Sequence, residues 1–123
     1  KIYGLQAGAG IGERFTILGE WDWANSLPGV LAIYPPAPNA RSNAAFVEAT
    51  YFIISGLSAT GRFDYFKTFS GPGSPIYYRY IFGLDIYPIP HVDLTPQIRY
   101  NTSKNVSGNS NPIEALVQSH IYF

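Results

Sequence analysis

The sequence has no cysteine, few charges and no long hydrophobic run, and each absence excludes a class of protein. Without cysteine there is neither a disulfide framework nor a thiolate metal site. Charged residues make up 13% of the 123 residues, and eight basic side chains balance eight acidic ones, so no electrostatic argument supports nucleic-acid binding. No apolar run approaches the roughly 18 residues that a membrane-spanning helix needs. The hydrophobic content of 46% must therefore be used in another way.

Apolar and polar residues alternate with period two, which is the signal of a β-strand. In VDLTPQIRYN, every even-numbered position is apolar and every odd-numbered position is polar, with Pro96 the residue that fits a strand least well. RFTILGEWDWA and YYRYIFGLDIY follow the same period, and no segment shows a helical one. The pattern predicts an all-β, antiparallel chain with about seven strands, at residues 1–10, 14–24, 44–55, 61–69, 76–87, 92–101 and 113–123.

The length of these strands and the order of their connections favour a transmembrane β-barrel. Each predicted strand has about ten residues, whereas strands of soluble proteins are most often about five or six long and tilted barrel strands need roughly nine to eleven. Short and long connections alternate along the chain, as they do in a barrel with short periplasmic turns and longer outer loops. Trp21 and Trp23 adjoin a long connection, where an aromatic girdle at the outer interface would lie.

The last segment, PIEALVQSHIYF, alternates and finishes on an aromatic residue. Ala115, Val117, Ile121 and Phe123 lie in phase on one face of the predicted strand. This strand resembles the closing strand of Gram-negative outer-membrane β-barrel proteins. The resemblance implies that Val117, Ile121 and Phe123 form an assembly signal read by the barrel-assembly machinery, that the protein lies in the bacterial outer membrane among its lipids, and that its C-terminus is periplasmic.

A second resemblance covers roughly the second half of the chain. RFDYF, GLDIYPIPHVDL and QIRYN look like the last hairpins of porin-like barrels, including those that sheathe multihaem cytochromes in porin–cytochrome conduits. It implies either a channel wall for passive solute passage or a sheath around an electron-transfer partner. Because single-chain bacterial barrels normally have an even number of strands, from eight upward, we expect the C-terminal part of a larger barrel. Several copies sharing one barrel is the alternative.

In such a barrel the polar positions of the strands line the lumen. The predicted lumen-lining residues are Glu20, Asp22, Glu48, Arg62, Asp64, Arg79, Asp85, Asp93, Arg99, Glu114 and His120. Mixed acids and arginines can set ion selectivity, and they can equally form a structural network that fills a narrow barrel. Seven acids against three arginines favour a weak cation preference.

No residues form a recognisable catalytic or cofactor site in the sequence. His91 and His120 are the two histidines, and each is expected to be a polar filler rather than a ligand, because a metal site needs several convergent ligands. No nucleophile–base constellation emerges, so we expect no enzyme activity and no cofactor. Two further functions stay open: an outer-membrane scaffold whose loops bind a partner protein, and a soluble secreted all-β domain.

Overall fold

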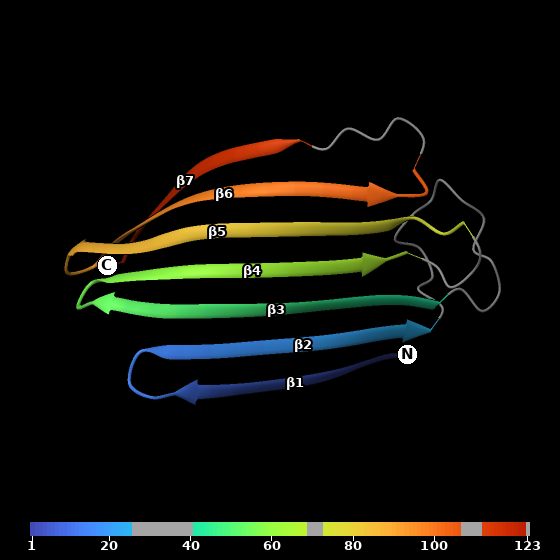
Figure 1. Ribbon diagram of the computed structural model, residues 1–123, viewed down its shortest axis with the longest axis horizontal. Coiled ribbons are helices and arrows are strands. Elements are labelled where there is room, and N and C mark those ends of the chain that lie inside the picture. The colour runs from blue at the N-terminus through green and yellow to red at the C-terminus, as the bar shows by residue number, and fades with distance from the viewer. Residues whose placement is uncertain (26–40, 69–72, 107–111, 123) are drawn as a thin grey trace.

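The computed structural model describes residues 1–25, 41–68, 73–106 and 112–122, and within them the chain is entirely β. Seven antiparallel strands form one sheet in which every strand pairs with its sequence neighbours (Figure 1). The strands are β1 (Ile2–Ile11), β2 (Phe15–Asn25), β3 (Arg41–Ile54), β4 (Leu57–Lys67), β5 (Ile76–Ile89), β6 (Val92–Lys104) and β7 (Ile113–Ile121). The predicted antiparallel all-β architecture is confirmed. The described residues include no helix that is long and apolar enough to cross a membrane.

Two of the turns are tighter than the sequence indicated, and the strands beside them are therefore longer. The predicted turn around GLSAT contracts to Ser55 and Gly56, so that β4 begins at Leu57 and not at residue 61. Gly56 has a φ of 80°, which lets the chain reverse over two residues. The turn between β5 and β6 likewise contracts to Pro90 and His91, and His91 takes a φ of 68°. In contrast, β7 ends two residues before the predicted limit, at Ile121.

The connections are sorted by length to opposite ends of the sheet. The short turns, residues 12–14, 55–56 and 90–91, lie at one end, which we call the turn end. The strand ends that precede and follow the longer connections, residues 26–40, 68–75 and 105–112, lie at the other, the loop end (Figure 1). Since strand directions alternate, β1 and β7 both run from the loop end to the turn end. They are the two edges of the sheet, which is not closed among the described residues.

The register divides the side chains between two faces of different chemistry. Odd-numbered residues of β1 to β4 and β7 share a face with even-numbered residues of β5 and β6, apart from the irregular pairs near Phe52 and Ile86. We call this the apolar face and the opposite one the polar face. The apolar face carries exposed side chains such as Trp21, Phe82 and Val117, which are 58%, 66% and 74% exposed.

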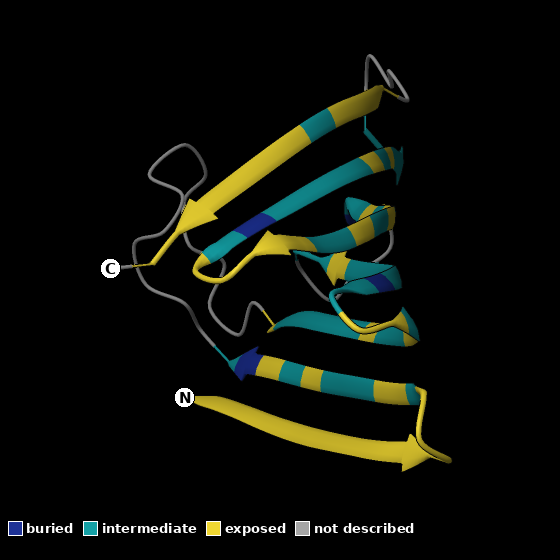
Figure 2. Cartoon of the chain, turned by 90° about the vertical axis from the view of Figure 1, so that its left-hand side faces the viewer, coloured by how far each residue is buried: buried dark blue, intermediate teal, exposed yellow. Residues whose placement is uncertain are grey.

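The sheet has no ordinary hydrophobic core. Among the described residues the one buried hydrophobic side chain is Ala24, whereas Ser58 and Asp93, two of the buried polar residues, belong to the polar face. Figure 2 shows that the strands form a single curved layer in which most positions are half-buried or exposed. Such a layer leaves its large apolar face for some other component to cover.

Pro96 interrupts the sheet locally without ending the strand. Residues of β5 and β6 pair regularly as far as Gly83 with Gln97, and the next pair is Ile86 with Leu94. The gap lies opposite Pro96, which has no backbone N–H to donate to a neighbouring strand. On its other side Pro96 remains paired with Val117 of β7. Pro96 therefore interrupts the backbone pairing of β6 with β5 over a short stretch.

Candidate functional site

The polar face gathers every charged position that the alternation assigned to a lumen. Backbone register places all of them on one side of the sheet, spread over β2 to β7. They are Glu20, Asp22, Glu48, Arg62, Asp64, Arg79, Asp85, Asp93, Arg99, Glu114 and His120. The sequence therefore identified which side chains share a face. Which of them touch is decided by the register of neighbouring strands.

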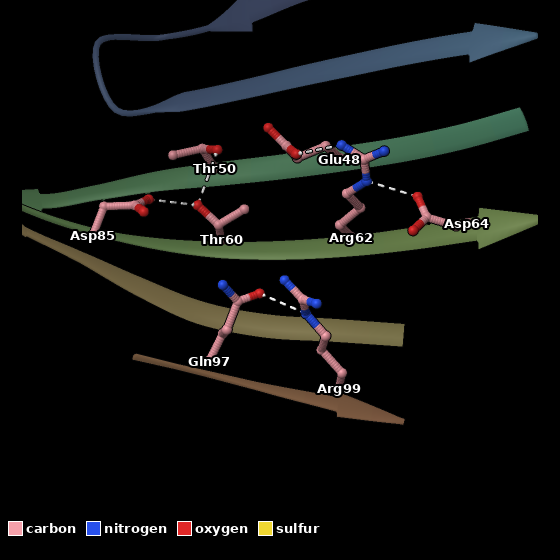
Figure 3. A network of polar contacts seen from close by, with 8 residues as sticks. All are labelled: Glu48, Thr50, Thr60, Arg62, Asp64, Asp85, Gln97 and Arg99. Atoms are coloured by element: carbon pink, nitrogen blue, oxygen red, sulfur yellow. Dashed lines mark hydrogen bonds and ion pairs between the residues drawn. The ribbon is translucent and has the colours of Figure 1, made fainter. Parts of the chain in front are cut away.

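Arg62 lies at the centre of an ionic cluster on β3 and β4 (Figure 3). Its Nε donates to Oδ1 of Asp64 at 2.6 Å, and its Nη1 lies 3.5 Å from Oε2 of Glu48, directly opposite on β3. Its guanidinium carbon lies 4.0 Å from the centroid of the Phe46 ring. Two carboxylates and an aromatic ring thus hold one guanidinium flat against the sheet, in the manner that suits arginine and not lysine.

Asp85 of β5 collects hydroxyl groups from the strands on both sides. Its Oδ2 accepts hydrogen bonds from Thr60 at 2.9 Å and from Ser58 at 3.2 Å, and its Oδ1 accepts one from Thr95 at 3.4 Å. Thr50 and Thr60 lie 3.4 Å apart, oxygen to oxygen, and extend the contacts to β3 (Figure 3). Neutral donors therefore satisfy this carboxylate without a basic partner.

A second chain of contacts crosses β5, β6 and β7. Asn101 accepts from Nε of Arg79 at 3.0 Å and donates to Glu114 at 3.1 Å. Gln97 accepts from Nε of Arg99 at 3.0 Å and donates to Gln118 at 2.7 Å. The neutral members of these contacts were absent from the predicted set, which held charged and histidine side chains alone. These neutral residues lie at the same alternate strand positions as the charged ones. The alternation in the sequence could therefore have predicted them.

His120 and Tyr122 secure the end of β7 to β6. Asp93 lies 3.0 Å from Nδ1 of His120 and accepts a hydrogen bond from the Tyr122 hydroxyl at 3.0 Å. The hydrogen bond to this carboxylate and its negative charge raise the pKa of the Tyr122 phenol. His120 is thus a partner of a carboxylate, and His91 lies in the turn between β5 and β6.

Two of the three residues assigned to the assembly signal lie on the opposite side of β7. Val117 and Ile121 belong to the apolar face and are 74% and 62% exposed. Phe123 lies outside the described residues. The structure therefore places the signal residues that it describes on the face that carries no network.

The polar face is hollowed at its centre. A depression of ≈ 440 Å³ is lined by polar-face residues from β3 to β7, among them Arg62, Asp85 and Arg99. Its wall presents carboxylates, guanidinium groups, hydroxyls and amides together. Within the described residues no group of three or more His, Cys, Asp or Glu side chains is arranged to hold a metal ion. The face offers a charged surface of mixed sign.

Comparison with known proteins gave no match: no protein-family model, no curated protein and no solved structure matches the chain.

Proposed function

We propose that the chain forms part of the wall of an outer-membrane β-barrel, with its apolar face against lipid and its polar face towards a water-filled lumen. The observation that carries the proposal is the unequal distribution of charge between the two faces of one sheet. All Asp and Glu side chains of the described strands lie on the polar face, and the middle of the apolar face carries no charged side chain. A bilayer requires this arrangement of a non-helical wall, because backbone groups within lipid must pair with neighbouring strands.

The exposed area of the apolar face argues against a soluble monomer. Soluble monomers rarely expose apolar patches larger than a few hundred Å². Here the apolar face carries exposed apolar side chains on every strand except β4, from Leu5 on β1 to Val117 on β7. The seven strands contain nine to fourteen residues, which is sufficient for tilted strands to cross the hydrocarbon layer. Sorting of short and long connections to opposite ends supports the same proposal.

The proposed activity is passive passage of small solutes with a preference for cations. The polar face carries seven carboxylates against three guanidinium groups. Arg62 is already paired with two of the acids, and Asp85 is satisfied by hydroxyls, so that its negative charge is not cancelled by a cation. A lumen lined in this way attracts cations electrostatically, and salt screens the attraction.

Cysteine substitution at adjacent positions tests the assignment of the faces, because the chain has no cysteine of its own. Gln97 and Ile98 are neighbours on β6 that face opposite sides. In the protein reconstituted into bilayers, a water-soluble, membrane-impermeant thiol reagent should label Q97C and spare I98C. A brominated lipid should quench a fluorophore attached at I98C more strongly than one at Q97C. Equal labelling of both positions, or a monodisperse wild-type protein without detergent, would refute the wall.

Conductance then tests passage itself. Planar bilayers containing the protein should show ion conductance whose reversal potential in a salt gradient indicates cation preference. The variant D85N should weaken that preference, whereas Y51F on the apolar face should leave it unchanged. If the labelling of both positions agrees with the proposal but no current flows, the proposed passive passage of solutes is wrong. The lumen is then filled by another component. A haem absorbance band in the purified protein would then point to a sheathed electron-transfer partner.

A further inference from the structure

The basic side chains of the apolar face all lie at its loop end. Lys67 of β4 lies opposite Ile76, which in turn lies opposite Lys104 of β6. Arg41 lies opposite Asn25, whose backbone N–H donates to the carbonyl of Lys1 at 2.8 Å. We call Lys1, Arg41, Lys67 and Lys104 the basic rim. Elsewhere on this face, the described strands carry no charged side chain.

The acidic residues are excluded from this rim. Every Asp and Glu within the described strands lies on the polar face, and Glu13 lies in a turn at the far end of the sheet. The rim therefore gains no neutralising carboxylate from the strands of its own face. Lys67 and Lys104 lie on the side that the proposed function assigns to lipid.

An aromatic shelf separates the rim from the aliphatic centre of the face. It consists of two contacting pairs, with ring centroids 5.6 Å apart for Tyr3 and Trp23 and 5.8 Å apart for Tyr65 and Tyr78. Nζ of Lys104 lies 5.7 Å from the centroid of the Tyr78 ring, which connects the rim to the shelf. From the middle of the apolar face towards its loop end, the side chains change from aliphatic to aromatic to basic. A bilayer changes in the same order, from hydrocarbon through the interface to the headgroups.

The turn end of the same face has no such arrangement. There the strands carry no basic side chain on this face: Leu57, Ile86, Val92 and Ile121 lie near the ends of β4 to β7, and Phe15 lies at the start of β2. A face that is basic at one end and neutral at the other meets the two leaflets of a bilayer differently.

We propose that the basic rim binds the phosphate groups of anionic lipid headgroups in the leaflet at the loop end. The proposal rests on the proposed function, because it requires that this face contacts lipid. Ammonium and guanidinium groups form charge-assisted hydrogen bonds with phosphate oxygens, and each cation near a membrane surface strengthens the attraction. The rim would also fix the depth of the wall, since aromatic residues prefer the interface just below the headgroups.

The test uses the full chain reconstituted into phosphatidylcholine bilayers that contain spin-labelled lipid. The association of spin-labelled phosphatidylglycerol with the protein is measured relative to that of spin-labelled phosphatidylcholine, at low salt. The wild type should prefer the anionic lipid, and K67Q and K104Q should each reduce the preference by up to about fivefold. The matched control is R14Q, which removes one exposed cation at the turn end and should leave the preference unchanged.

Three results would overturn the rim as a lipid-phosphate site. The preference could be absent in the wild type, it could survive in the double variant K67Q/K104Q, or R14Q could reduce it as much. Inorganic phosphate added at constant ionic strength serves as the competing source of the same chemistry. Its displacement of the labelled lipid at millimolar concentration would assign the rim to free phosphate instead. Failure of the proposed function has a separate signature, because then even labelled phosphatidylcholine shows no protein-restricted component.

Discussion

Arg62 makes three side-chain interactions on the polar face. Its guanidinium contacts a carboxylate on its own strand, a carboxylate on the neighbouring strand and an aromatic ring. The side chains of Arg62 and Glu48 are 34% and 30% exposed, so water screens their attraction considerably. Arg62 therefore contributes more to fixing the positions of its neighbours than to the free energy of unfolding.

Double-mutant cycles should rank the two ion pairs of Arg62. We expect a coupling free energy of about 1 kcal/mol for R62Q with D64N, and a smaller one for R62Q with E48Q. The reason is geometric, because the contact with Asp64 is 2.6 Å long and that with Glu48 is 3.5 Å. Urea unfolding in detergent micelles gives the four free energies of each cycle. A larger coupling with Glu48 would show that the interaction across the strands dominates.

Gly4 is adapted to the carboxylate of Asp22 on the neighbouring strand. A Cβ placed at Gly4 would collide with that carboxylate, whereas one at Gly10, on the same face of β1, would meet nothing within 4 Å. We expect G4A to lower the free energy of unfolding by about 1 kcal/mol relative to G10A, because Asp22 must leave its preferred rotamer. Urea unfolding of both variants measures the difference. G4A/D22A should remove it, and a persistent deficit would locate the cost in the backbone.

Single residues also show how much of the structure can be predicted from the sequence. The alternation placed eleven polar side chains on one face correctly, because a strand has a strict period of two. It did not reveal that Arg62 pairs with Glu48 and Asp64 while Arg99 turns to Gln97. Those partners depend on register and rotamer, which follow from the whole sheet and not from a local pattern.

At the scale of elements, β7 is the strand most dependent on a few contacts. It is the shortest strand, it pairs with β6 alone, and most of its residues are exposed. Tyr122 secures its end twice, through its hydroxyl to Asp93 and through its backbone N–H to the carbonyl of His91 at 2.9 Å. The side chain of Tyr122 thus supports the end of a strand whose other edge is unpaired in this sheet.

Removal of that hydroxyl should loosen the end of β7. We expect Y122F to speed amide exchange near Ile121 several-fold while leaving the amides of β3 unchanged, measured by hydrogen exchange of the protein in detergent. The matched control is Y77F, another exposed tyrosine of the polar face, which should have no effect on β7. Unchanged exchange in Y122F would mean that the backbone contact with His91 suffices.

The same contact should respond to pH with a defined sign. The folded-state pKa of Tyr122 is raised by Asp93, so the phenol stays a donor at pH values where an unfolded tyrosine begins to ionise. Its contribution is fully present below pH ~10 and is lost as the pH rises through the raised value. The protection factor near Ile121, which corrects for the base-catalysed rise of intrinsic exchange with pH, should therefore fall in the wild type above that value, and in Y122F it should not.

The strands themselves were easier to predict than their ends. All seven arise from alternation, yet β4 begins four residues earlier than its pattern suggested. The residues Leu57 to Thr60 include small and polar side chains that read as a turn in isolation. They pair with β3 and β5 because Gly56 reverses the chain tightly, and the neighbouring strands then supply hydrogen bonds on both sides.

At the scale of the whole molecule, the direction of the two edge strands limits how the sheet can close. The strands β1 and β7 run the same way, so direct pairing of the two would be parallel. A barrel in which all neighbours are antiparallel therefore needs an odd number of further strands between them. The alternation does not give that number, because it reports only on the seven strands themselves. An unpaired edge within lipid would leave backbone groups unsatisfied, at a cost of several kcal/mol for each group.

Amide exchange at the edges tests closure directly. In an antiparallel edge strand the amides that point away from its partner have no acceptor within the sheet. In the assembled protein in bilayers, we expect all amides of β1 between Leu5 and Ala9 to be protected to an extent similar to those of the central strand β4. Alternate fast and slow exchange along β1 would show that its outer edge is open. That pattern would contradict the lipid-embedded wall, because an open edge is tolerated in water and not in hydrocarbon.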